Sequence, residues 1–169
     1  VGSYSSPHLI DYNERVRIRT EPVSDADLCR AFERVEAARA DTPLTYFEFG
    51  TLAAMELFRR HGMRIVVLEV GLGGRLDAVN AWDADVALIS AIGIDHTDWL
   101  GPDRESIGRE KAGVYRSGRP AICSDPAPPA SVAQTAAQVG ARLYQAGRDF
   151  SFEAQETAWL WRHGERVRS

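Results

Sequence analysis

Three short apolar runs most constrain the fold of this chain. They are residues 65–70, 85–92 and 121–123, and each ends in turn residues. Runs of this length and composition are typical of strands that are buried on both faces of a parallel sheet. Helical patterns lie before and between them, and such alternation implies right-handed crossovers. We therefore predict a three-layer α/β fold, with a mainly parallel sheet and helices on both of its faces.

Four segments have the periodicity and the end signals of helices. They are residues 25–39, 47–61, 104–115 and 131–139. Ser24 and Asp27 are spaced as a capping box before the first helix, and Gly62 and Gly140 follow the second and fourth, where a left-handed residue ends many helices. These helices supply the crossovers that a parallel sheet needs.

Two further segments alternate polar and apolar residues. Residues 15–19 place Val16 and Ile18 between arginines, which predicts an exposed edge strand. In the tail, aromatic residues alternate around a polar turn, which predicts a C-terminal β-hairpin. These aromatic residues are Phe150, Phe152, Trp159 and Trp161.

Charge and hydropathy narrow the class of protein. The formal net charge of -4 has no basic stripe, so the chain lacks the electrostatic pattern of proteins that bind nucleic acid or an anionic membrane. No apolar run reaches the length of a membrane span, and no signal segment opens the chain. Cys29 and Cys123 share no metal-type spacing and are expected to be buried thiols. We predict a cytoplasmic protein whose partners are small molecules.

Lysine is almost absent from the chain. Lys and Arg total 20, and Lys111 is the only lysine. A lysine amine can lose its proton and act as a nucleophile, whereas arginine stays charged. Either position 111 requires an amine, or a single lysine has survived there by chance.

The exit of the first predicted strand carries a carboxylate and a glycine-rich loop. Glu69 lies inside an apolar run, where a buried charge requires a metal ion, an arginine such as Arg75, or a backbone amide. Gly71 and Gly73 do not complete a dinucleotide-binding fingerprint, because Leu76 occupies the third small position. Ligands bind beyond the carboxyl ends of parallel strands, so this loop is a candidate site.

The next strand exit is polar as well. His96 lies between Asp95 and Asp98 and is suited to bind a metal through one ring nitrogen while a carboxylate orients the other. The hydroxyl of Ser6 is a possible Mg²⁺ ligand, although residues 5–7 also have the composition of a simple turn. The residues after this exit lead to the helix that carries Lys111.

A second candidate region is the start of the helix at residues 45–48. Its amides suit an anion or a polar edge of a substrate, while Glu48 is equally explained as an ordinary first-turn acid. Lys111 does not lie in a glycine-rich phosphate loop, so a Walker motif is absent from these residues. The residues alone indicate metal-assisted phosphoryl or acyl chemistry in an α/β domain.

Six motifs, in order, make the interpretation specific. They are residues 4–9 (YSSPHL), 14–16 (ERV), 45–48 (TYFE), 68–78 (LEVGLGGRLDA), 95–101 (DHTDWLG) and 110–113 (EKAG). From Val1 to about Phe152 they resemble the central domain of the folylpolyglutamate synthase / dihydrofolate synthase branch of the Mur ligase family. This resemblance implies an enzyme in which ATP phosphorylates the carboxylate of dihydropteroate or a folate, and the amine of L-glutamate then displaces phosphate from the acyl phosphate.

The resemblance also implies roles for individual residues. Ser6, Glu69 and His96 match the Mg²⁺ ligands of the family, and Lys111 matches its carbamylated lysine, which arginine cannot replace. Two magnesium ions would neutralise charge as the phosphoryl group moves. The residues that match the pterin- or pteroate-binding segments are Thr45, Tyr46, Phe47, Glu48, Leu76, Asp77 and Ala78. Of these, Asp77 is suited to accept hydrogen bonds from the pterin amino edge.

The resemblance covers part of the family's length. Residues 1–152 match a partial central domain and 153–169 a truncated hairpin, while the upstream phosphate loop and the C-terminal domain have no counterpart; the first residue is Val1 rather than Met. We expect the 169 residues alone to be inactive, and the full-length enzyme to be a monomer. Two alternatives stay open, a nonenzymatic folate-binding remnant and a Mur ligase acting on a peptidoglycan precursor.

Overall fold

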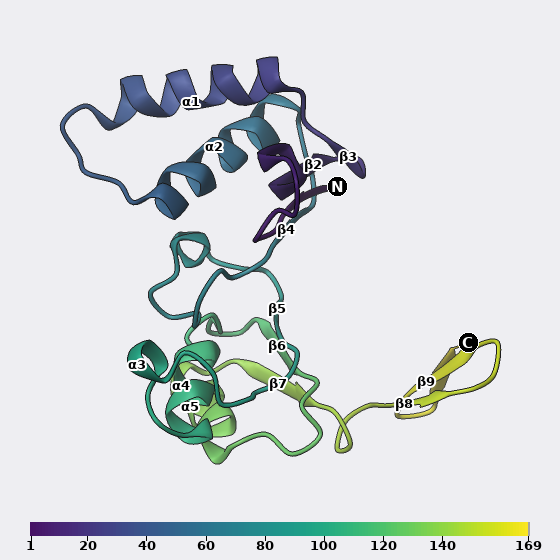
Figure 1. Ribbon diagram of the computed structural model, residues 1–169. Coiled ribbons are helices and arrows are strands. Elements are labelled where there is room, and N and C mark those ends of the chain that lie inside the picture. The colour runs from purple at the N-terminus through teal and green to yellow at the C-terminus, as the bar shows by residue number, and fades with distance from the viewer. Residues whose placement is uncertain (169) are drawn as a thin grey trace. The chain divides into compact units, whose positions relative to one another are not determined.

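The computed structural model describes residues 1–168, and the chain divides into two compact units (Figure 1). Unit 1 comprises Val1–Leu72 and Asp77–Ala81. Unit 2 comprises Gly73–Leu76 and the chain from Trp82 onward. Each unit has its own hydrophobic core of buried residues, the first around Tyr4 and Leu57 and the second around Ile107 and Cys123.

Unit 1 is built on a four-stranded sheet with the order β3-β2-β1-β4. The central strand β1 pairs in parallel with β4, with Tyr4 opposite Leu68, and in antiparallel with β2, with Tyr4 opposite Val16. The strands and the helical elements of this unit are β1 (Gly2–Tyr4), η1 (Tyr12–Arg15), β2 (Val16–Ile18), β3 (Glu21–Pro22), α1 (Asp25–Arg39), α2 (Tyr46–Arg60), β4 (Val66–Leu68) and η2 (Ala78–Ala81).

The capping signals in the sequence fix where the two long helices begin. The Ser24 hydroxyl accepts the Asp27 amide at 3.1 Å, and the Asp27 carboxylate accepts the Ser24 hydroxyl at 2.9 Å, instead of the Ser24 amide that a full capping box requires. A full capping box does form at α2, between Thr45 and Glu48. The predicted boundaries of α1 are confirmed, and α2 begins one residue before its predicted start.

Unit 2 contains a parallel sheet with the order β5-β6-β7. The chain passes through α3 and α4 between β5 and β6, and through α5 between β6 and β7, as parallel pairing requires. The elements are β5 (Ala87–Ile89), α3 (Thr97–Leu100), α4 (Arg104–Ala112), β6 (Pro120–Cys123), α5 (Ala130–Val139) and β7 (Arg142–Gln145). Gly140 is left-handed with φ 73°, as predicted for the residue that ends α5.

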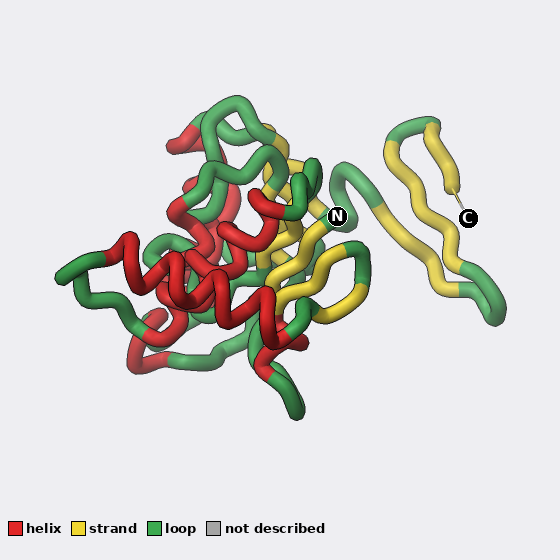
Figure 2. Tube along the Cα trace, turned by 90° about the horizontal axis from the view of Figure 1, so that it is seen from above, coloured by secondary structure: helices red, strands yellow, loops and turns green. Residues whose placement is uncertain are grey.

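The C-terminal residues form a three-stranded antiparallel sheet with the order β10-β9-β8, whose strands are yellow in Figure 2. Its strands are β8 (Ser151–Ala154), β9 (Trp159–His163) and β10 (Arg166–Arg168). The predicted hairpin corresponds to β8 and β9, with Phe152 opposite Trp161, and β10 extends it to a third strand.

Several local predictions are wrong. Residues 15–19 do not form an edge strand, because β2 lies between β1 and β3 and Val16 is fully buried. Two of the three runs predicted to be buried on both faces are not, since they form the edge strands β4 and β5, in which Val67 is 55% and Leu88 62% exposed. Of the two cysteines, Cys123 is buried but Cys29 is exposed.

The predicted helix over residues 104–115 is also too long. The structure ends α4 at Ala112 and follows it with Gly113. Gly113 lies directly against Arg75, where an added side chain would collide with the Arg75 backbone and side chain. Glycine is common at the ends of helices, and the close approach of Arg75 leaves no room for a side chain at this position.

We expect Leu57→Ala to reduce the free energy of unfolding by about 2–5 kcal/mol, because it leaves a cavity in a packed core. Leu57 is fully buried on α2, whereas Leu52 on the same helix is 38% exposed. Urea unfolding would measure both variants, with Leu52→Ala as the matched control. Equal losses for the two variants would contradict the assignment of the core.

Candidate active site

Ser6 and Glu69 lie together where the parallel strands β1 and β4 end. The Glu69 amide donates to the Tyr4 carbonyl at 2.9 Å, and one Glu69 carboxylate oxygen accepts the Ser6 amide at 2.9 Å. Glu69 is exposed and lies just beyond β4, so the prediction of a buried charge within the strand is wrong. Of the three partners left open for it, the structure shows a backbone amide, while Arg75 pairs with Glu110 at 3.0 Å.

A second carboxylate holds the loop that follows Ser6. Glu14 accepts the amides of Leu9, Ile10 and Asp11 at 2.9, 2.9 and 2.8 Å. These hydrogen bonds lower the pKa of Glu14 from 4.5 to about 2, with the Leu9 amide contributing most. In the sequence Glu14 stands out only as part of a motif, because the spacing of an acid three residues after Asp11 does not identify three amide partners.

The next residue, Arg15, is a buried cation between the same loop and α2. It is 8% exposed, and its Nε donates to His8 Nδ1 at 2.7 Å. Its guanidinium lies over the rings of Tyr12 and Tyr46, at 5.3 and 5.7 Å from their centroids. Such contacts stabilise a cation that has left water. The structure thereby joins the loop after Ser6 to the predicted substrate segment at the start of α2.

That segment begins with a satisfied capping box. The Thr45 amide donates to Glu48 at 2.7 Å, and the Glu48 amide donates to the Thr45 hydroxyl at 3.2 Å. The hydrogen bond from the Thr45 amide lowers the pKa of Glu48. This cap is the contact expected of a first-turn acid, and the substrate role of Glu48 stays a prediction. Tyr46 is 65% exposed.

A cavity of about 740 Å³ opens beside Thr45 and Tyr46 within unit 1. Aromatic and apolar side chains dominate its wall, and among them are Tyr12, Phe32, Leu44 and Phe49. The size and the lining are those of pockets for small organic molecules.

The glycine-rich loop after β4 is organised by Asp77. One of its carboxylate oxygens accepts the amides of Gly71 and Leu72, each at 3.0 Å, and the other accepts the Val79 amide at 2.9 Å. Gly71 lies close to the ring of Phe47, since a Cβ at this position would be 2.8 Å from Phe47 Cζ. Two predicted substrate residues, Phe47 and Asp77, thus meet at the same loop.

The remaining predicted substrate residues follow in the chain. Leu76 is 80% exposed, and Ala78 begins the 3-10 helix η2. Gly74 lies against the last turn of α4, where a Cβ would be 2.8 Å from the carbonyl oxygens of Glu110 and Lys111. The loop segment 73–76 therefore docks on the end of the helix that carries Lys111, and the Arg75–Glu110 ion pair reinforces this contact.

His96 belongs to unit 2 and lies where the chain turns into α3. It is left-handed, with φ 51°, which is uncommon for a residue with a side chain. Its amide donates to the Asp95 carboxylate at 2.7 Å, and its Nε2 lies 3.7 Å from the same carboxylate. The imidazole is 57% exposed, so it is accessible to a ligand.

The predicted metal ligands come from both units. Among residues 1–168, no group of three or more His, Cys, Asp or Glu side chains is positioned to hold a metal by itself. Ser6 and Glu69 offer a hydroxyl and a carboxylate in unit 1, and His96 offers an imidazole in unit 2. This donor set is of a kind that divalent cations accept. The metal role of the three residues stays a prediction.

In the part of the chain that the structure describes, no helix is long and apolar enough to cross a membrane.

No family model matches the chain. Among curated proteins, the dihydrofolate synthase/folylpolyglutamate synthase of Escherichia coli is 51% identical over 95% of this chain and 38% of its own length. The protein of the same name from Haemophilus influenzae is 42% identical over 96% of this chain and 37% of its own length. The chain therefore spans about two fifths of the length of these relatives.

Solved structures agree with this similarity. Escherichia coli FolC in complex with DHPP and ADP has a TM-score of 0.96 and 48% identity, over 98% of this chain and 40% of that one. The bifunctional folylpolyglutamate synthase/dihydrofolate synthase of Yersinia pestis, complexed with AMPPNP and Mn ion, has a TM-score of 0.95 and 54% identity, over 99% of this chain and 41% of that one. The resemblance and the α/β fold class that the motifs predict are confirmed.

We expect the stability contributed by Glu14 to depend on pH. Because folding lowers its pKa from 4.5 to about 2, this contribution is complete above the unfolded value and is lost as the pH falls through about 2. Glu14→Gln should therefore destabilise the protein at neutral pH, and the difference from the unchanged protein should shrink as the solution becomes acidic.

Thermal unfolding between neutral and acidic pH would measure this difference. Glu33→Gln removes an exposed acid of α1 and controls for the loss of one charge. A Glu14→Gln difference that stays constant over the whole range would contradict the three-amide contact.

Proposed function

We propose that the protein containing this chain, which is similar to the folylpolyglutamate synthase / dihydrofolate synthase family over nearly all of its residues, is an ATP-dependent ligase. Its reaction joins L-glutamate to dihydropteroate, to a folate, or to both, in folate biosynthesis and one-carbon metabolism. The observation that carries this proposal is the 51% identity to the Escherichia coli protein over 95% of the chain. All the motif residues lie within the described residues 1–168, which supports it.

The proposed reaction follows from the resemblance. ATP phosphorylates the carboxylate of the pteroate or folate, and the glutamate amine attacks the resulting acyl phosphate and releases phosphate. Ser6, Glu69 and His96 would hold two Mg²⁺ ions. When bound, these ions would supply positive charge that neutralises the transferring phosphoryl group. Complexes of the Yersinia pestis relative with AMPPNP and Mn ion agree with the use of ATP and a divalent metal.

Lys111 has a separate role in this proposal. A carbamylated amine is an anion that helps to hold the metal and to orient the phosphate, which the guanidinium of arginine cannot do. Lys111 lies in the last turn of α4, a turn that is fixed by the contact with Gly74 and by the Arg75–Glu110 pair at 3.0 Å. These contacts support a fixed position for the backbone of Lys111.

The substrate ring would be held at the loop that Phe47 and Asp77 share. An ionised carboxylate has about four acceptor positions, and Asp77 uses three of them for backbone amides. One position is left to accept a hydrogen bond from a pterin amino group, and the apolar face of Phe47 suits an aromatic ring. The aromatic cavity is lined by Thr45 and Tyr46, the residues just before Phe47 at the start of α2.

We expect Lys111→Arg to lower ligase activity roughly a hundred-fold or more, as the loss of a charge-stabilising group does. The assay is ATP- and glutamate-dependent product formation by the full-length protein. Arg109→Lys, on the same helix, is the matched control and should keep activity. Full activity of Lys111→Arg would exclude the carbamate.

For the 169-residue chain alone we propose no turnover, and measurable product would refute that statement.

We expect Asp77→Asn to weaken dihydropteroate binding about ten-fold, because both its loop contacts and its free acceptor position are impaired. Calorimetric titration would measure this, with Asp41→Asn, in the loop before α2, as the control.

A protein that binds dihydropteroate without ligating glutamate would favour the folate-binding remnant. Binding of a uridine-linked peptidoglycan precursor in place of dihydropteroate would favour the other Mur ligase. The cytoplasm is the compartment in which we place the reaction.

A further inference from the structure

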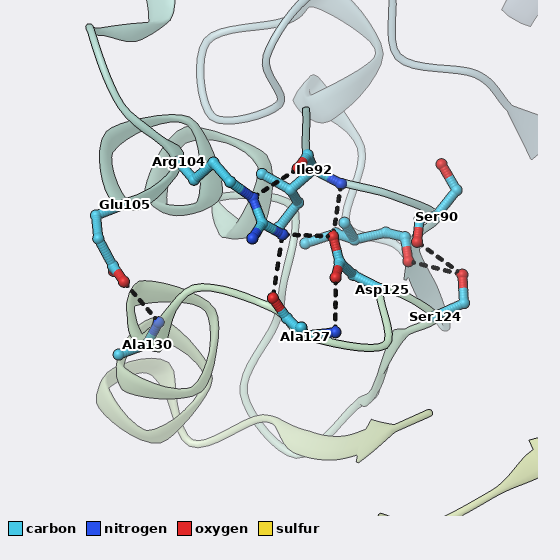
Figure 3. Close-up of polar contacts among 9 residues, drawn as sticks. Ser90, Ile92, Arg104, Glu105, Ser124, Asp125, Ala127 and Ala130 are labelled. Carbon is cyan, nitrogen blue, oxygen red and sulfur yellow. Dashed lines mark hydrogen bonds and ion pairs between the residues drawn. The ribbon is translucent and has the colours of Figure 1, made fainter. Parts of the chain in front are cut away.

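A buried carboxylate fastens the segment that carries His96. Beyond β5 the chain is exposed except at Ile92, which is 4% exposed, until it reaches Leu100 at the end of α3. Both backbone groups of Ile92 have charged partners: its amide donates to Asp125 at 2.8 Å, and its carbonyl accepts from Arg104 Nε at 2.8 Å (Figure 3). His96 follows only four residues later.

The same carboxylate completes the network. Asp125 is 5% exposed, and it also accepts Arg104 at 3.0 Å and the Ala127 amide at 2.9 Å. Burial raises the pKa of Asp125, but the hydrogen bonds from Ala127, Ile92 and Arg104 outweigh burial and hold the pKa below its ordinary value. The buried charge is therefore compensated and stays ionised at neutral pH.

Side-chain hydrogen bonds connect the chain segments that follow β5 and β6. The β5–β6 ladder ends with Ile89 opposite Cys123. The Ser124 hydroxyl then donates to the Ser90 carbonyl at 2.9 Å, and Asp125 accepts the Ile92 amide (Figure 3). After the ladder ends, successive residues of the β6 exit continue to hold the β5 exit.

Arg104 extends this connection to the helix of Lys111. It is the first residue of α4, and Lys111 lies seven residues later, which is the same face two turns along. An α-helix of this length is a rigid spacer, with a rise of about 1.5 Å per residue. The pair of Arg104 and Asp125 thus links the rigid helix that carries Lys111 to the segment that carries His96.

We propose that Asp125 and Arg104 are positioning residues that fix the His96 segment relative to Lys111. The inference rests on the proposed function for the roles of His96 and Lys111, but the fastening itself does not. The hydrogen bonds of both residues to this segment go to the backbone of Ile92, so each acts on His96 through that backbone. Groups that orient metal ligands in this indirect way commonly change metal affinity ten- to a hundred-fold when lost.

Three variants test the proposal. Asp125→Asn removes the charge that binds Arg104, and Arg104→Lys keeps the charge but loses the planar fork that reaches both Ile92 and Asp125. Glu105→Gln is the matched control, because Glu105 is the next residue of α4 and binds the Ala130 and Ser131 amides of α5 at 2.9 and 2.8 Å, away from the His96 segment.

Hydrogen exchange of this chain measures the fastening directly. We expect the Ile92 amide and residues 93–96 to exchange about ten-fold faster in Asp125→Asn and Arg104→Lys than in the unchanged chain. In Glu105→Gln they should keep their rate, even if the melting temperature falls equally. Unchanged exchange in the first two variants, or the same increase in all three, would overturn the proposal.

Mn²⁺ titration of the full-length protein measures the positioning. We expect Asp125→Asn and Arg104→Lys to bind Mn²⁺ about ten-fold more weakly, and Glu105→Gln to bind it normally. Equal Mn²⁺ affinity in all variants would overturn the positioning role, even if exchange is faster. If the unchanged protein does not bind Mn²⁺, the metal site of the proposed function is wrong, and hydrogen exchange alone then decides whether the segment is fastened.

Discussion

The parallel pairing of β1 with β4 is the interaction on which unit 1 depends. The two strands are far apart in the sequence, and their register places Tyr4 opposite Leu68. The pairing requires a glycine at position 2, because a side chain there would lie 2.5 Å from the ring of the buried Phe58. Once the register is set, Ser6 and Glu69 leave the sheet side by side, and the hydrogen bond between them follows from the geometry of the two strands.

Carboxylates that accept backbone amides organise every loop of the candidate site. Glu14 holds the loop after Ser6, Asp77 holds the glycine-rich loop, and Asp125 holds the exit of β5. Each amide that is bound in this way is one that regular secondary structure does not satisfy. One carboxylate can accept several neighbouring amides with its two oxygens. A small side chain therefore gives an irregular loop a defined shape.

The sequence predicts the parts of the fold that depend on local chemistry. Ser24 and Thr45 start α1 and α2 because a hydroxyl near free amides is stabilising wherever it occurs, and Gly140 ends α5 because its left-handed conformation favours glycine. The glycine-rich run after Glu69 likewise located the end of a strand. Its exposure could not be predicted, because the apolar run continues past the point where pairing with β1 ends.

The parts that could not be predicted depend on distant residues. Asp125 lies in a proline-rich turn, and only the arrival of Ile92 and Arg104 gives its carboxylate a role. The close approach of Arg75 to Gly113, at the end of α4, likewise depends on a residue that is distant in the sequence. For Lys111 and His96, the motif identified the residues, whereas their surroundings came from the structure. Periodicity gives no information about such contacts, since their partners lie on other elements.

The contact of Glu14 with three successive amides also limits how this loop can change in length. The carboxylate reaches Leu9, Ile10 and Asp11 only because the chain between them and Glu14 has a fixed number of residues. An insertion or deletion there would separate the acid from its amides and leave Leu9 and Ile10, which are 90% and 84% exposed, without a defined path.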